Sequence, residues 1–326
     1  MAVERNDFTE AIRKSGYEWY WEEYEEISTT YQELFTEKDI TAPYIKEVSS
    51  TGMGDLKEKP ESEPIQEAAP QEGFPIYGKV RTFASKVSWS MELYDDSQVE
   101  SLFQDTVSSW GRSVPRTKDR WYAQFFNYGG YTAGHSVFNN SLPDILVDSS
   151  GDLIYDGYPL FTLTNNARSS MGGETYFNSG GALDLDATNL QAVYQAMTAT
   201  NNRDEKDDEI IIEPNILLIP PGLKFIADEL LQYEKQNTDF LLYKDKPSIA
   251  LAGKITPVVW PRLTDTDAWF LLEKQKGLIA LNRMEEQIDF YKDNETKAYV
   301  ASILVRFGGY VNNWRYMYGS NLATSA

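Results

Sequence analysis

The chain of 326 residues contains no cysteine and only one histidine. Without cysteine there can be no disulfide framework, thiolate zinc site, iron–sulfur cluster or cysteine nucleophile, and a reducing, intracellular site of assembly fits. Any histidine-based triad or imidazole metal site would depend on His135 alone. His135 lies in a glycine-flanked turn without a G-x-S-x-G, H-E-x-x-H or H-x-E signature, so we interpret it as an ordinary turn residue.

Long apolar runs and glycine-rich phosphate loops are also missing. The N-terminal residues MAVERNDFTEAIRK hold no apolar stretch of signal-peptide length, and no run approaches the ~20 residues that span a bilayer. We therefore expect neither secretion nor membrane insertion, and place the protein in the cytosol where it is made. No G-x-x-x-x-G-K-[ST] or G-x-G-x-x-G motif supports phosphate binding.

Basic residues are scarce, with 30 Lys and Arg against 50 Asp and Glu and a net charge of −20. This balance argues against a protein that grips nucleic acid through a basic face. The acid is unevenly spread, because residues 1–72 hold 7 basic and 18 acidic side chains, a net charge of −11. At 41% apolar residues, the chain can still build one large or two medium domains.

The N-terminal part reads as a helical arm followed by an extended excursion. One helical stripe collects apolar and aromatic side chains that need a partner surface, namely Tyr20, Tyr24, Ile27, Tyr31, Leu34 and Phe35. Residues 52–75 are rich in Gly, Pro and Glu and predict an exposed loop. Period-two alternation over residues 83–93 then predicts a strand with one buried face. Residues 44–93 thus resemble a long two-stranded excursion that lies on something else.

A long amphipathic helix is the clearest predicted element. The capping-box spacing of Ser97 and Glu100 starts it, an apolar stripe continues to Phe125, and Gly129 and Gly130 end it. Pro115 should bend this rod, but the stripe keeps its phase across the proline, so we predict one bent helix.

The second half of the chain shows α/β patterning after an irregular connection over residues 127–181. We predict a helix from Asp186, an acidic loop at 203–209, a strand at 216–219, a helix after Pro220-Pro221-Gly222, and strands at 248–260, 268–273 and 298–318. The acidic loop lacks the spacing of a calcium loop and is interpreted as solvated.

Paired carboxylates beside tryptophan raise the possibility of a glycan hydrolase, with two acids as acid and base. The candidates are Asp265 and Asp267 beside Trp269, and Glu22 and Glu23 beside Trp21. Among 50 carboxylates such adjacency is expected by chance, so this enzyme is kept only as an alternative. The 44 aromatic residues point instead to assembly, since Tyr and Trp are enriched at interfaces.

Several motifs in order resemble the major capsid proteins of tailed bacteriophages, which have the Hong Kong 97-type fold. They are KVSWSMELYDDSQVESLFQ (86–104), the D-G-x-x-L-F turn at 156–161, Leu217-Leu218-Ile219-Pro220-Pro221, and Arg306-Phe307-Gly308-Gly309 through Tyr318-Gly319-Ser320-Asn321. The similarity is nearest to the Mu-like major head subunit group and covers most of residues 44–321.

This resemblance implies an α+β fold with five parts. They are an N-terminal arm (1–43), an extended loop (44–93), a peripheral domain with a spine helix at about 97–128 (94–184), an axial domain (185–285), and a return strand with the C-terminal tail (286–326). It further implies a structural protein without catalytic residues, metal or cofactor. Copies would self-assemble into hexamers and pentamers of an icosahedral virion shell, in the host bacterial cytoplasm.

The implied partners are other copies of the chain, a portal protein, and scaffold or decoration proteins, with double-stranded DNA enclosed but not read and no membrane. An acidic inner wall suits that role, because like charge suppresses adhesion of packed DNA. Expected assembly contacts are Tyr20, Tyr24 and Tyr31 of the arm, and the basic residues Lys79, Arg81 and Lys86, which would meet acidic arm or spine residues of an adjacent subunit. The closest alternative is an encapsulin-like shell that holds protein cargo.

Overall fold

The computed structural model describes residues 18–24, 29–50, 58–59, 61, 72–90, 99–132, 156–170, 172–231, 251, 253–293, 295–296 and 298–322. His135, Ile27, Ser97 and most of the predicted loop at 52–75 lie outside the described residues.

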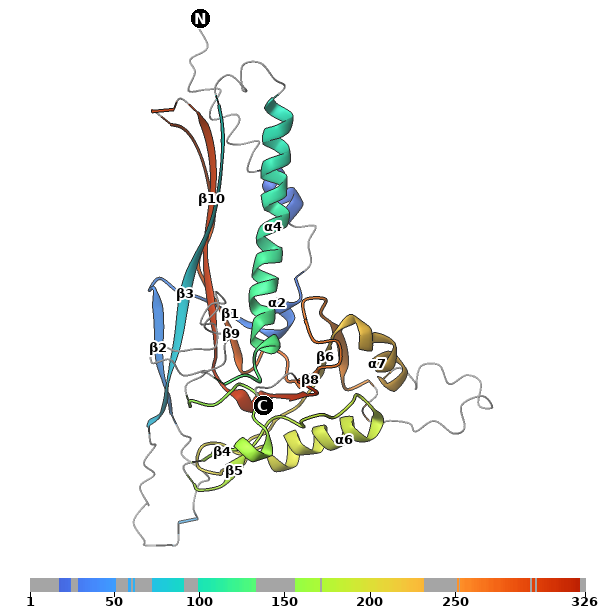
Figure 1. Cartoon of the computed structure of the whole chain (residues 1–326). Coiled ribbons are helices and arrows are strands. Elements are labelled where there is room, and N and C mark those ends of the chain that lie inside the picture. The colour runs from blue at the N-terminus through green and yellow to red at the C-terminus, as the bar shows by residue number, and fades with distance from the viewer. Residues whose placement is uncertain are drawn as a thin grey trace, which may run out of the picture.

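A long helix runs beside a long twisted sheet and forms the taller part of the molecule (Figure 1). The helix is α4, and the sheet has five strands in the order β1-β9-β10-β3-β2. The bounds are Val99–Asn127 for α4, Thr36–Asp39 for β1, Tyr44–Ser50 for β2, Glu72–Trp89 for β3, Leu278–Lys292 for β9 and Tyr299–Val311 for β10. All pairings are antiparallel except β1 with β9.

The apolar face of this sheet packs against α4 because alternate strand residues point to one side. Phe307 on β10 stacks on Phe83 of β3 with ring centroids 4.5 Å apart, and it also contacts Trp121 of α4. The glycine pair after Phe307 lets the helix come close, since the Tyr122 hydroxyl donates a hydrogen bond of 2.8 Å to the Gly308 carbonyl. A Cβ at Gly309 would lie 3.2 Å from the Tyr122 ring.

The predicted single helix is confirmed, because α4 continues through Pro115. Pro115 cannot donate the backbone hydrogen bond that would end on the Gly111 carbonyl. The helix survives this loss because Val114 and Pro115 are buried and Trp110 and Trp121 anchor it to the core on either side.

Two strands of the long sheet are not predicted from the sequence. β1 exposes all four of its residues, so no apolar residue signals it. In β9, the apolar residues 278–281 are contiguous and a charged stretch follows, so period-two alternation is missing. The two-stranded excursion expected at 44–93 is confirmed for residues 44–50 and 72–79, where β2 and β3 pair antiparallel. From Lys79 onward β3 pairs with β10, so the excursion lies on the rest of the long sheet. β9 also crosses the expected domain boundary at residue 285.

A second, four-stranded sheet in the order β11-β8-β6-β7 lies at the lower end of α4 with helices α6 and α7 (Figure 1). Its strands are β6 (Ile216–Ile219), β7 (Thr256–Val259), β8 (Trp269–Leu272) and β11 (Met317–Ser320). The helices are α6 (Ala187–Gln195), capped by Asp186 and continued by a π-helical turn, and α7 (Lys224–Leu231). Helices α6 and α7 and strands β6 and β8 match the predicted elements closely, and β6 matches without a shift. The strand predicted at 248–260 is wrong in its length, because β7 covers only Thr256–Val259 and Gly253 and Lys254 lie in a turn before it.

The closing segment of the chain joins the two sheets. β10 ends at Val311, a short turn (Trp314–Tyr316) follows, and β11 then enters the second sheet. The predicted single strand at 298–318 is thus two strands. Among the described residues, no helix combines the length and apolar character that crossing a bilayer requires.

Candidate assembly surfaces

The N-terminal stripe is covered by the chain's own long helix. Residues 18–24 form a helix that passes α4 at Gly111, where a Cβ would lie 2.6 Å from the Tyr20 carbonyl oxygen. Further along, in α2 (Tyr31–Leu34), Tyr31 stacks on Tyr122 with ring centroids 4.5 Å apart, and Phe35 follows it against the same ring. The stripe therefore has a partner within its own chain, and the expectation that it needs the surface of another copy is wrong. Gly111 allows this packing because it lets the two helices approach closely.

A buried ion pair joins α4 to the sheet beneath this helical segment. The Lys118 Nζ lies 2.6 Å from Glu286 Oε1, with the two side chains 11% and 4% exposed. Lys118 also donates to the Tyr24 hydroxyl at 3.3 Å, so Tyr24 contributes to an internal network. Burial, the largest single effect, lowers the pKa of Lys118, but Glu286 and Tyr24 together outweigh it, so the pKa of Lys118 is raised. For Tyr20, by contrast, burial raises the pKa far above its usual value.

Asp119 of α4 connects three segments that are distant in the sequence. Its carboxylate accepts hydrogen bonds from the Thr30 backbone amide at 3.1 Å and from the Trp260 indole at 3.0 Å. Arg262 lies 3.6 Å from the same carboxylate. The N-terminal segment, the long helix and the second sheet are thereby held in one unit, which favours a rigid subunit.

The three basic residues expected at assembly contacts all lie on β3, but on opposite faces. Lys79 and Arg81 share the strand parity of Phe83, which faces α4, whereas Lys86 has the opposite parity. Lys79 and Lys86 are exposed and Arg81 is half-buried. The structure therefore does not bring the three together as one basic surface.

Exposed apolar side chains mark other candidate surfaces. On α7, Phe225 is 81% exposed and Ile226 beside it is also exposed. On β2, which is an edge strand within the part of the chain that the structure describes, Tyr44 and Val48 are exposed. An open strand edge and contiguous apolar residues are features that proteins normally cover with a partner.

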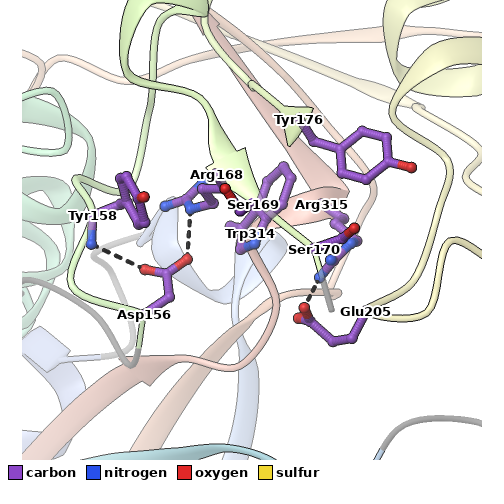
Figure 2. A pocket seen from close by; sticks show the side chains of 9 residues that line it. All are labelled: Asp156, Tyr158, Arg168, Ser169, Ser170, Tyr176, Glu205, Trp314 and Arg315. Atoms are coloured by element: carbon purple, nitrogen blue, oxygen red, sulfur yellow. Dashed lines mark hydrogen bonds and ion pairs between the residues drawn. The ribbon is translucent and has the colours of Figure 1, made fainter. Parts of the chain in front are cut away.

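The D-G-x-x-L-F turn is held to the closing segment by a buried polar cluster (Figure 2). The Arg168 guanidinium lies 2.6 Å from Asp156 and stacks on the Trp314 ring at 4.4 Å. Arg315 packs over the same ring at 4.6 Å and binds Glu205 at 2.9 Å. Burial raises the pKa of Asp156 although the adjacent Arg168 opposes the shift.

This cluster leaves a cavity of about 30 Å³, which has room for only about two water molecules. The charged side chains of this cluster form pairs of opposite sign, so the cluster stabilises the contact between the turn and the closing segment. Asn178 completes it, since its amide oxygen accepts from the Thr162 amide at 2.9 Å and its amide nitrogen donates to the Leu160 carbonyl at 2.9 Å. Asn178 is not predicted from the sequence, because no local pattern marks it.

The carboxylates considered for glycan hydrolysis do not form a site in the structure. Asp265 caps its own turn by accepting from the Asp267 amide at 3.1 Å, and Trp269 is fully buried and cannot stack on a sugar. Glu23 pairs with Arg112 of α4 at 3.2 Å. Within the described ranges, no group of three or more His, Asp or Glu side chains is placed to hold a metal ion.

The sequence matches one known protein family over most of its length. The family model described as "Phage capsid protein" matches residues 74–320, which is most of the chain. The match includes α4, the four-stranded sheet, β9, β10 and nearly all of β3, whereas β1 and β2 precede it. The chain belongs to the phage capsid protein family. No curated protein matches it. The resemblance read from the 156–161 turn and the closing glycines is thereby confirmed at the level of the family.

Solved capsid structures share the fold of this capsid chain at very low sequence identity. The capsid of the Cyanophage P-SCSP1u has a TM-score of 0.53 at 11% identity, over 91% of this chain and 89% of that one. The capsid of a native GTA particle has a TM-score of 0.52 at 14% identity, over 89% of both chains. Mycobacterium phage Bobi gives 0.53 at 9% identity, over 92% of both.

The α+β capsid fold expected from the resemblance is therefore confirmed by the solved structures, and the family match confirms a phage capsid protein. The family also identifies the chain as a structural protein. The buried networks described above are consistent with this role, because they stiffen one subunit and leave strand edges and α7 exposed.

Proposed function

We propose that this chain is the major head subunit that self-assembles into hexamers and pentamers around the double-stranded DNA of a tailed bacteriophage. The observation that carries the proposal is the family match over residues 74–320, on a fold whose long helix packs along the long sheet. Assembly takes place in the bacterial cytoplasm. A portal protein and scaffold or decoration proteins complete the head, which in this proposal belongs to the Mu-like group.

In this proposal, each of the expected parts of the chain has its own role in the shell. The peripheral domain with α4 and the long sheet supplies stiffness, and the axial domain, with Phe225 and Ile226 exposed on α7, meets its copies around a symmetry axis. The extended loop that begins at β2 reaches a neighbour, where Lys79, Arg81 and Lys86 meet acidic side chains. Tyr20 and Tyr31 are left out of these contacts because their own chain buries them.

Sedimentation of the full-length chain from expressing cells tests the proposal. Material that sediments as large particles supports a shell, whereas a monodisperse monomer with activity on glycans would support the hydrolase. Particles from infected cells should then be treated with nuclease and their absorbance compared at 260 and 280 nm. A ratio typical of nucleic acid supports a DNA head, and a protein ratio supports the encapsulin-like shell.

A further inference from the structure

An arginine ridge runs along the solvent-exposed face of α4. Arg112, Arg116 and Arg120 follow one another at intervals of four residues, and all three are exposed. At 1.5 Å per residue their Cα atoms rise by about 6 Å from one to the next, on neighbouring turns of the helix. Among the exposed charged residues of the described part of α4, only Asp105 is acidic. This face is therefore net positive in a chain of net charge −20.

Within the described residues, the chain's own N-terminal segment forms an ion pair with only one arginine of the ridge, Arg112. Glu23 Oε2 lies 3.2 Å from Arg112, beside the Gly111 contact. The segment then continues along the side of α4 that carries Asp119 and Tyr122. At 100° per residue, Arg116 and Arg120 lie about 60° and 100° around the helix from Asp119. Within the described residues, neither of these two guanidinium groups makes an ion pair or a hydrogen bond.

The spacing of the ridge does not stabilise the helix. Like charges four residues apart on a helix destabilise it by about 0.2–0.5 kcal/mol per pair. Arginine also presents a planar fork of donors that matches a carboxylate in two hydrogen bonds, which lysine does not. A repeated, exposed arginine at a small cost in helix stability indicates a surface that binds an anionic partner.

We propose that Arg116 and Arg120 bind carboxylates from the acidic N-terminal 72 residues of a neighbouring copy of this chain. The proposal rests on the self-assembly proposed above. Charge complementarity favours this partner, because every copy carries 18 acidic and 7 basic residues in that stretch, and Glu23 of the same stretch already occupies Arg112. DNA is disfavoured, since phosphate binding needs clustered basic residues and the chain as a whole repels a polyanion.

Charge reversal tests the ridge. The double variant Arg116→Glu/Arg120→Glu should reduce the fraction of chain that sediments as shells about tenfold, because each subunit replaces attractive contacts by repulsive ones. The matched control is Lys254→Glu/Lys274→Glu, which makes the same charge change at two exposed turn residues. The control should stay within about twofold of the wild type in this assay.

A chemical crosslink identifies the partner without reversing any charge. Shells of the variant Arg116→Lys/Arg120→Lys are treated with a carbodiimide, which joins a lysine amine to a carboxylate in direct contact. In the covalent dimers, mass spectrometry should find a bond between α4 and a peptide from residues 1–72 that is absent from covalent dimers of the wild type.

The outcomes separate the ridge from the assembly itself. If wild type and control form no shells, the proposed function fails. If they form shells and the ridge variant does so equally well, or if the introduced lysines crosslink only within one chain or to other regions, the ridge proposal is overturned. A ridge variant that makes normal shells but packages less DNA would overturn it in favour of a DNA contact.

Discussion

Single residues at the contact between the N-terminal helix and α4 determine whether the two can pack. Gly111 is the clearest case, because any Cβ there meets the Tyr20 backbone carbonyl, which cannot move aside as a flexible side chain would. The Lys118–Glu286 pair beneath it is the second, since both charges are almost completely removed from water. A substitution at either residue should therefore change the free energy of unfolding differently from the same substitution at an exposed position.

Gly111→Ala should destabilise the protein, although replacing glycine by alanine inside an exposed helix normally stabilises it by about 1 kcal/mol. The new Cβ would lie 2.6 Å from the Tyr20 carbonyl oxygen, so the helix at 18–24 must shift. We expect a loss of about 1–3 kcal/mol in the free energy of unfolding, measured with denaturant. The exposed Ser109→Ala on the same helix is the control and should change it by less than about 0.5 kcal/mol. A stabilised Gly111→Ala variant would contradict the observed packing.

Lys118→Met should leave the Glu286 carboxylate buried without its partner. Breaking a buried pair on one side typically costs about 3–5 kcal/mol, whereas replacing both partners by apolar residues is often close to neutral. We therefore expect the double variant Lys118→Met/Glu286→Leu to recover most of the stability that Lys118→Met loses. Equal losses in the single and double variants, measured by urea unfolding, would show that the pair is not the cause.

Glu47 on β2 should make stability sensitive to acid. A hydrogen bond from Lys38, with a further one from Tyr310 at 3.0 Å, holds the pKa of Glu47 below its ordinary value of 4.5. A depressed folded-state pKa contributes stability that is present above the unfolded value and is lost as the pH falls through the folded value. The wild type should exceed Glu47→Gln by a few tenths of a kcal/mol, roughly, near pH 7, and this difference should vanish in acid. Unfolding measured from pH 7 to 3 checks it, with the exposed Glu285→Gln as the control variant on the same sheet.

At the scale of elements, the strands of the long sheet meet at one crowded junction. Lys79 of β3 pairs with Tyr44 of β2 on one side and with Gly309 of β10 on the other. Gly308 lies at the same point, and its backbone carbonyl accepts the Tyr122 hydroxyl of α4. The extended loop, the long sheet and the spine helix are therefore coupled through a glycine pair.

Gly308→Ala should weaken this junction, because a Cβ there would lie 2.2 Å from the Lys79 carbonyl oxygen. We expect a loss of about 1–3 kcal/mol in the free energy of unfolding, since two paired backbones must separate. Ser302→Ala, at the same parity of β10, is the matched control and should cost less than about 0.5 kcal/mol. Faster proteolysis near β2 in the Gly308 variant would locate the weakened junction. If the two variants unfolded alike, the crowding would have no energetic consequence.

Elements with local periodicity could be predicted from the sequence, and those formed by distant pairing could not. The apolar stripe of α4 and the four apolar residues of β6 predict their own structure. β1 exposes every residue and exists only because β9 lies beside it. The same reason explains the arm, because nothing in the stripe from Tyr20 to Phe35 tells whether its partner is α4 of the same chain or of a neighbour. The closing turn shows the limit for polar networks, since Arg168 and Trp314 are far apart in sequence.

At the scale of the whole molecule, acidic and basic side chains are concentrated in different parts of the chain. The acidic excess near the N-terminus and the arginine ridge on α4 have opposite signs, so one copy offers what another can bind. The rigid body of α4 and the long sheet would transmit such contacts across a shell, while edge strand β2 and the exposed apolar residues of α7 add further contact area. Many modest contacts per subunit suffice when they are repeated around closed rings.

Electron cryomicroscopy of particles formed by the full-length chain tests the central claim most directly. We expect closed shells of icosahedral symmetry, built from rings of six and of five copies. Each copy in these shells should have α4 beside the five-stranded sheet. A uniform population of monomers, or open sheets and filaments without closed shells under conditions that keep the chain folded, would contradict it.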